Sequence, residues 1–204
     1  VKSAIGDRPV YDFAVMAGGN TVSSFDGGTA SISIPYSLKS GEDKNAVVVY
    51  YIDDSGELQA VRGAYNEATG AVEFTVSHFS KYAVGYNKIS FADVSGSAWY
   101  SDAVTFLSAR GITTGTSATT FSPNAAISRG DFLVMVMRAY GIEPLKNSAD
   151  NFADAGNAYY TEYLAAAKKL KITKGVGDNL YRPGEKISRQ DMFTLLYRTL
   201  DELD

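Results

Sequence analysis

Cysteine is absent from this 204-residue sequence, and histidine occurs only once. The chain can therefore form no disulfide and no thiolate zinc site, and it has too few histidines for a conventional multi-histidine metal site. The longest purely apolar run, residues 46–52, is seven residues long, whereas a membrane-spanning helix needs about twenty. We therefore expect no metal, no cofactor and no membrane span.

Basic residues are a minority: 19 lysines and arginines stand against 23 acidic residues, for a formal net charge of −4. Nucleic-acid-binding proteins normally carry a basic excess, so no nucleic-acid partner is expected. A Gly-x-Ser-x-Gly elbow, a phosphate-binding loop and a dinucleotide fingerprint are also missing. Because the chain starts at Val1 without a signal segment, we interpret it as an excised piece or the product of signal removal.

The first 88 residues have the pattern of short strands separated by turns. β-prone runs alternate with segments that contain glycine, asparagine or aspartate, which supply the positive φ that hairpins need. Residues 53–56, with two adjacent acids, fit a hairpin turn better than a calcium loop, because too few oxygen ligands lie nearby. We predict an antiparallel β-sandwich over residues 1–88, with strands at 10–15, 21–25, 29–36, 46–52, 58–65, 71–77 and 82–86.

After residue 88, apolar residues recur at helical spacing and the sequence repeats itself. Residues 102–138 align without a gap on residues 162–198, and Phe91-Ala92-Asp93 matches Phe152-Ala153-Asp154 after a shift of one residue. Each copy has the pattern of a helix, a long loop and a second helix. We predict an all-α bundle of two helix-loop-helix repeats, 89–148 and 149–204, that pack against each other.

The second helix of each copy is predicted to begin at a serine, Ser128 or Ser188, that is followed three residues later by aspartate. This is a capping-box variant. Arg129 and Arg189 at the same helix starts would add a guanidinium to the positive end of the helix dipole, which suits a carboxylate or phosphate. Residues 161–200 hold eight basic and four acidic side chains, which favours either a local anionic partner or a merely solvated helix face.

Short motifs mark both copies. The first has Phe91-x-Asp93-Val94, Trp99-Tyr100, Ala103-Val104, Gly111-Ile112, Gly115, Phe121-x-Pro123 and Ile127-Ser128-Arg129-Gly130-Asp131-Phe132; the second has Tyr160, Ile172, Gly175, Tyr181-x-Pro183 and Ile187-Ser188-Arg189-Gln190-Asp191. Together they resemble the S-layer homology repeat over residues 89–204. The resemblance implies an extracellular protein of Gram-positive-type bacteria, held noncovalently on the cell wall or S-layer through secondary cell wall polysaccharide, which is often pyruvylated.

The resemblance also implies a site. Family members usually carry three repeats with ligand grooves between neighbours, so a third repeat would follow residue 204 or come from another chain. The family's Thr-Arg-Ala-Glu motif is changed here, but its hydroxyl, guanidinium and carboxylate are kept. Trp99 either plugs the seam between repeats or stacks on a sugar. Positions that match the family's polysaccharide-binding residues are Asp93, Trp99, Gly115, Arg129, Asp154, Tyr160, Gly175 and Arg189.

The β-rich region resembles, through residues 6–10, 34–36 and 78–84, a module found before such repeats in clostridial-type surface proteins. Within it, His78-Phe79-Ser80 is a tripeptide that cleaves itself in some unrelated β-rich domains: the Ser80 hydroxyl attacks the Phe79 carbonyl and His78 acts as the base. The alternative is a strand end with a packed histidine. We expect a nonenzymatic wall anchor, with self-processing or assembly with other surface-layer proteins as alternatives.

Overall fold

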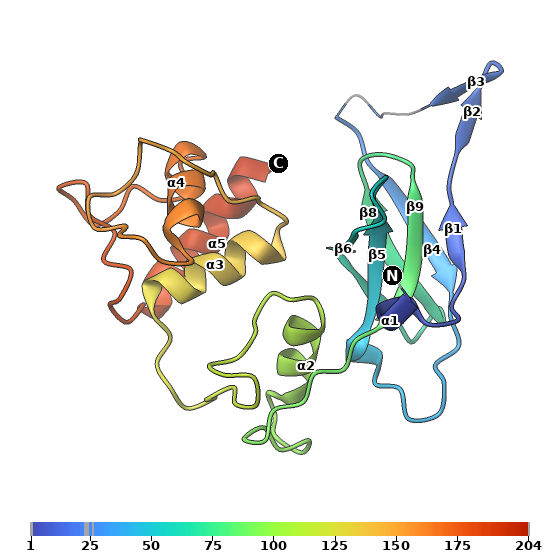
Figure 1. Cartoon of the computed structure of the whole chain (residues 1–204), viewed down its shortest axis with the longest axis horizontal. Helices are drawn as coiled ribbons and strands as arrows, with labels where there is room; N and C mark the ends of the chain where they lie inside the picture. The colour runs from blue at the N-terminus through green and yellow to red at the C-terminus, as the bar shows by residue number, and fades with distance from the viewer. Residues whose placement is uncertain (1, 23–24, 26, 204) are drawn as a thin grey trace. The chain divides into compact units, whose positions relative to one another are not determined.

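The computed structural model describes residues 2–22, 25 and 27–203 and divides the chain into two compact units, residues 1–121 and 122–204 (Figure 1). The border between the units falls inside the predicted first repeat, so contacts divide the chain differently from its sequence periodicity. The borders at residues 88 and 148 stay a prediction from that periodicity.

Over its described residues, the first unit contains nine strands, two short helices and one longer helix. Its helices are α1 (Lys2–Ile5), the 3-10 helix η1 (Lys44–Ala46) and α2 (Ser101–Ala109). The strands are β1 (Val10–Asp12), β2 (Val15–Ala17), β3 (Asn20–Val22), β4 (Ala30–Pro35), β5 (Val47–Ile52), β6 (Leu58–Val61), β7 (Gly63–Asn66), β8 (Ala71–Val76) and β9 (Lys81–Tyr86).

The strands form two main antiparallel sheets with the orders β1-β9-β5-β6 and β4-β8-β7, and β2 and β3 pair as a separate hairpin (Figure 1). One core lies between the main sheets, because Val49 and Val84 of the first sheet pack with Val72 and Phe74 of the second. The predicted antiparallel β-sandwich is therefore confirmed.

Two predicted strands are each divided in the structure. The run 10–15 becomes β1, which pairs with β9, and β2, which pairs with β3. The run 58–65 becomes β6, which pairs with β5, and β7, which pairs with β8 in the other sheet. The predicted strand 21–25 agrees with the end of β3 only in part, since residues 23 and 24 lie outside the described residues. Pairing partners, which a local pattern does not contain, decide these divisions.

The helical region has four main helices, as two helix-loop-helix repeats predict. The second unit contains α3 (Arg129–Ala139), α4 (Thr161–Lys169) and α5 (Arg189–Leu203) around one apolar core, into which α3 of the first repeat inserts Leu133 and Met137. The two repeats therefore pack together through the second helix of the first repeat. The first helix of that repeat, α2, belongs to the first unit.

Candidate functional site

The helices α3 and α5 start with the same cap. Ser128 Oγ accepts the backbone N–H of Asp131 at 3.1 Å, and Ser188 Oγ accepts that of Asp191 at 3.1 Å. Each serine hydroxyl also donates to the aspartate that follows it, at 2.6 and 3.0 Å. The predicted serine–aspartate caps are thus present in both repeats. One arginine follows each serine, so Arg129 and Arg189 occupy equivalent positions at the two helix starts.

Arg129 lies inside the second unit, with 7% of its surface exposed. Its Nε donates to the backbone oxygen of Tyr181 and its Nη1 donates to Asp191 Oδ2, each at 2.9 Å. The guanidinium carbon lies 4.9 Å from the centre of the Tyr181 ring. Burial raises the pKa of Tyr181 to about 12, although the charge of Arg129 acts in the opposite direction. Arg129 is therefore held by residues of the second repeat.

The second repeat also accepts hydrogen bonds from the backbone N–H groups at the start of α3. The N–H groups of Arg129 and Gly130 donate to the carbonyl oxygens of Glu185 and Pro183, at 2.8 and 2.9 Å. The first N–H groups of a helix have no partner within the helix and often receive an anion. Here these two groups and that of Asp131 all have protein partners, so the start of α3 has no N–H left for an anion.

The start of α5 is open. Arg189 and Gln190 are exposed. Over the residues that the structure describes, neither their backbone N–H groups nor the guanidinium of Arg189 make a hydrogen bond or ion pair. Exposed cations precede it along the chain: Lys169, Lys171, Lys174, Arg182 and Lys186. This helix start therefore combines a guanidinium and two N–H groups, which together suit a carboxylate or phosphate.

Trp99 and Tyr159 are exposed aromatic residues that lie just before the first helix of each repeat. Trp99 is 93% exposed and meets Tyr100 edge to face at 5.5 Å between ring centroids. Since α2 begins at residue 101 and α4 at residue 161, the structural counterpart of Trp99 is Tyr159 and that of Tyr100 is Tyr160. Tyr160, matched to Trp99 in the sequence comparison, is half-buried and packs near Gly130.

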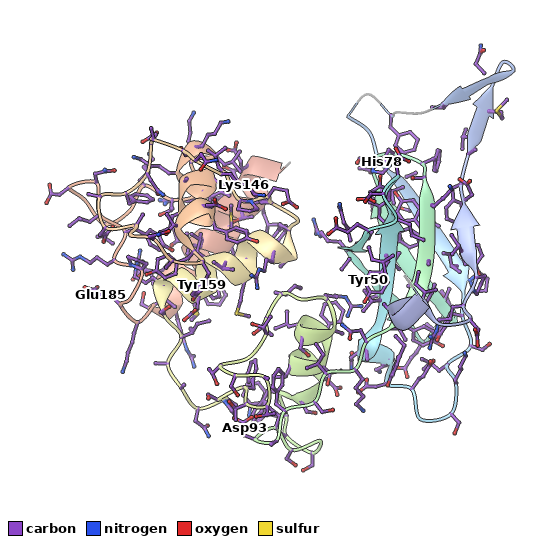
Figure 2. All side chains as sticks on the ribbon, viewed as in Figure 1. Tyr50, His78, Asp93, Lys146, Tyr159 and Glu185 are labelled. Carbon is purple, nitrogen blue, oxygen red and sulfur yellow. The ribbon has the colours of Figure 1, made fainter. Side chains whose placement is uncertain are left out.

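Sequence comparison missed Tyr159 because the second repeat is one residue shorter just after Asp154. The Tyr159 hydroxyl donates to Asp131 at the start of α3 (Figure 2). Burial and this hydrogen bond to a carboxylate raise the pKa of Tyr159. The signal that could have identified Tyr159 is the Gly-x-Ala-aromatic-Tyr pattern at 96–100, which recurs without a gap at 156–160.

The predicted acids shape loops. Asp93 Oδ1 accepts the N–H of Phe121 at 2.8 Å, and Asp154 accepts those of Tyr181 and Arg182 at 2.8 and 2.7 Å (Figure 2 labels Asp93). Each acid therefore ties the opening of its repeat to the loop before the second helix. This role is structural, and a polysaccharide-binding role for the two acids stays a prediction.

The predicted glycines have steric roles. Gly115 and Gly175 have φ of +75° and +74°, where a Cβ would lie 2.5 Å from the Thr120 oxygen or 2.2 Å from the Leu180 oxygen. No other residue fits these turns without movement of the backbone. The glycines thus let the loop pass closely over the aromatic side chain that opens each repeat, and direct binding by them stays a prediction.

His78 and Ser80 lie at the end of β8 and before β9 in the first unit. The imidazole meets the Tyr51 ring edge to face at 5.1 Å, and the His78 carbonyl accepts the Tyr82 hydroxyl at 3.0 Å (Figure 2 labels His78). The Ser80 carbonyl accepts the N–H of Phe13 at 3.1 Å. In the described part of the chain, no hydrogen bond joins His78 to Ser80. The histidine thus has a packing role at the strand end.

Comparison with known proteins identifies the repeats. The family model described as S-layer homology domain matches residues 90–133 and 151–193. The chain is 28% identical over 166 residues to an amylopullulanase of Thermoanaerobacterium thermosulfurigenes, which covers 81% of this chain. It is 32% and 30% identical over 107 residues, 52% of this chain, to an S-layer protein of Bacillus thuringiensis subsp. finitimus and to S-layer protein sap of Bacillus anthracis.

The chain therefore carries two S-layer homology domains behind a β-rich region, as the sequence motifs predicted. It spans only 9% to 13% of the length of these three relatives. Domains of this family imply attachment to the cell wall, so the chain belongs to a protein of the cell surface. None of the helices, so far as the structure describes them, combines the length and apolar character needed to span a membrane.

Proposed function

We propose that this chain, with its two S-layer homology domains, holds its protein on the cell wall by binding an anionic secondary cell wall polysaccharide. The observation that carries the proposal is the open start of α5, where exposed Arg189 stands beside two backbone N–H groups that have no acceptor among the described residues. An acidic sugar substituent, such as the carboxylate of a pyruvyl group, is complementary to that arrangement.

The second repeat adds charge of the right sign. Residues 161–200 carry eight basic against four acidic side chains, although the whole chain has a net charge of −4. Exposed cations that precede Arg189 would attract a polyanion over several repeat units of the polymer, and each contact would weaken as salt is added. Exposed Trp99, in the first unit, offers a flat apolar face of the kind that stacks on a sugar ring.

Arg129 has a different role in this proposal. Because its guanidinium is already paired with Asp191 and the Tyr181 carbonyl, it holds the two repeats together and positions the helix starts. A polymer carboxylate would have to displace Asp191 before it could reach this guanidinium. Of the two equivalent arginines, we therefore assign the direct contact with the polymer to Arg189.

The test is cosedimentation of the chain with purified cell walls before and after removal of the secondary polymer. We expect binding to intact walls, loss of binding to stripped walls, and a decrease in affinity of roughly tenfold or more for Arg189→Ala, because a charged hydrogen bond is lost. Lys39→Ala removes the same charge from an exposed position of the β-rich region and is the matched control. Equal pelleting with both walls would refute the proposal, and equal affinity of the two variants would refute the assigned site.

The alternatives have their own tests. Self-processing would break the bond between Phe79 and Ser80, and the packing of His78 against Tyr51 supports the competing strand-end interpretation. Mass spectrometry of the purified chain distinguishes them, since cleavage gives two fragments. Assembly with surface-layer proteins predicts oligomers in analytical ultracentrifugation without polymer, whereas anchoring alone predicts a monomer or an exchange of repeats between chains.

A further inference from the structure

The two repeats differ at the end of their first helix. Helix α2 ends in Ala109, followed by Arg110, while the equivalent positions at the end of α4 are Lys169 and Leu170. Ala109 is buried and Lys169 is exposed. The repeat that follows the β-rich region thus has a small residue and an arginine where the second repeat has a lysine and a leucine.

Arg110 connects α2 to the β-rich region, inside the first unit. Its guanidinium donates to three carbonyl oxygens of that region: Gly63 at 2.9 and 3.2 Å, Asn45 at 2.9 Å and Val47 at 2.8 Å. It also lies 3.5 Å from the centre of the Phe106 ring on its own helix. No carboxylate pairs with Arg110 among the described residues, so main-chain carbonyls supply the hydrogen bonds to this half-buried cation.

Arg110 is suited to this role. The fixed fork of a guanidinium can donate to several carbonyls at once, which an ammonium group on a flexible stem does less well. Burial lowers the pKa of Arg110 to about 10, which still leaves the side chain protonated at neutral pH. A charge removed from water in this way is tolerated only where hydrogen bonds replace its hydration, as they do here.

Ala109 completes the contact. It belongs to an apolar cluster with Ile5 of α1 and with Val48, Tyr50 and Ala83 on the outer face of the β5–β9 pair. A further hydrogen bond runs from Asn87 Nδ2 to the Ala109 carbonyl at 2.7 Å and satisfies one of the last carbonyls of α2. The β5 strand is consequently buried on both faces, which explains its uninterrupted apolar run.

Each partner needs the other for physical reasons. Helix α2 has nine residues, and isolated helices of that length are unstable in water. Without the end of α2, Val48 and Tyr50 would lose part of their apolar cover. The match to the amylopullulanase covers 81% of the chain and so must extend into the β-rich region, which fits a shared arrangement of the two parts.

We propose that the β-rich region is the N-terminal cap of the S-layer homology array, docked through Arg110 and Ala109 so that it and the first helix of the first repeat fold as one cooperative unit. A cap of this kind covers the terminal element of a repeat array, which has no preceding repeat to pack against. The proposal concerns folding of the array and does not depend on which polymer it binds.

The test is hydrogen exchange on the full chain with Ala109→Lys, which introduces the residue of the second repeat, and with Arg110→Met. We expect amide protection in α2 and in strand β5 to decrease together by about tenfold or more, while α3 and α4 keep theirs. Lys169→Ala, the reverse exchange in the second repeat, is the matched control and should change protection nowhere in the first unit.

Two outcomes would overturn the proposal: unchanged protection of α2 in both variants, or loss of protection in α2 with β5 unaffected. If Arg110→Met does not fold, Asn87→Ala serves as the milder variant, because it removes only the hydrogen bond to the Ala109 carbonyl. It should lower protection in the same two elements by a smaller factor, and an unchanged pattern would again refute the cap.

Discussion

The starts of α3 and α5 have the same sequence pattern and the same cap, yet their arginines have opposite surroundings. Arg129 is buried against Tyr181 and Asp191, while Arg189, one repeat later, is exposed. The difference continues along the helices: Leu133 is 0% exposed, and Phe193, at the equivalent position, is 71% exposed. An identical motif can therefore hold the protein together in one repeat and be available to a ligand in the next.

The largest expected difference in stability is between alanine substitutions at Leu133 and at Phe193. Leu133→Ala should lower the free energy of unfolding of the second unit by about 2–5 kcal/mol, because it leaves a cavity in the core. Phe193→Ala should change it by less than about 0.5 kcal/mol, since most of the ring is already in water. Chemical denaturation of both variants measures this. Similar losses would mean that the exposed face of α5 is covered in solution.

The stability losses of Arg129→Ala and Arg189→Ala should differ by less than those of the leucine–phenylalanine pair. Arg129→Ala removes two hydrogen bonds and leaves the Tyr181 carbonyl without its donor, which should lower stability by about 1–3 kcal/mol. Arg189→Ala should leave stability within about 0.5 kcal/mol of the parent, because this side chain has no partner in the part of the chain that the structure describes. The same denaturation curves test the comparison, and a loss in Arg189→Ala as large as in Arg129→Ala would contradict it.

The caps should respond alike. Ser128→Ala and Ser188→Ala each remove the acceptor for one backbone N–H, so each should reduce stability by about 1 kcal/mol. This pair is the reference for the leucine–phenylalanine and arginine comparisons, because the serine cap is the feature that the two helix starts share. A loss at Ser188 near zero would show that α5 frays at its start.

The smallest expected effect is a gain of stability. The first helix of the first repeat is followed by Gly111 with φ of +68°, whereas Lys171 occupies the equivalent place with φ of +59°. Since glycine adopts this left-handed conformation without a steric penalty, Lys171→Gly should raise stability by about 0.5–1 kcal/mol. A thermal or chemical melt checks the sign, and Gly111→Lys should give the opposite change.

Local patterns predicted much of the fold. The alternation in the first 88 residues and the serine caps at Ser128 and Ser188 depend on neighbours in the chain, so they could be inferred from the sequence. The division of residues 58–65 between β6 and β7 could not, because it depends on which sheet each half pairs with.

The site was predicted less completely. The sequence identified both arginines as equivalent, but only the packing of the second repeat onto the first distinguishes them. The sequence also matched Trp99 to Tyr160, because the second repeat is one residue shorter after Asp154 and the alignment of the two repeats shifts there. The starts of α2 and α4 in the structure show that Trp99 corresponds to Tyr159. The sequence assigned Asp93 and Asp154 to polysaccharide binding, which stays a prediction; it did not reveal that they accept hydrogen bonds from backbone N–H groups 27 or 28 residues away in the chain.

By itself the sequence determined two repeats, their caps, the acidic balance of the chain and the β-rich region before them, because each follows from composition or short-range spacing. Tertiary structure decided which arginine is buried, which aromatic is exposed and that α2 packs on the β-rich region. The reason is that burial and hydrogen bonding between distant segments depend on which surfaces meet. The arginine of the Ser-Arg-x-Asp motif at α3 meets the second repeat, whereas the arginine of the same motif at α5 has no partner within the described residues.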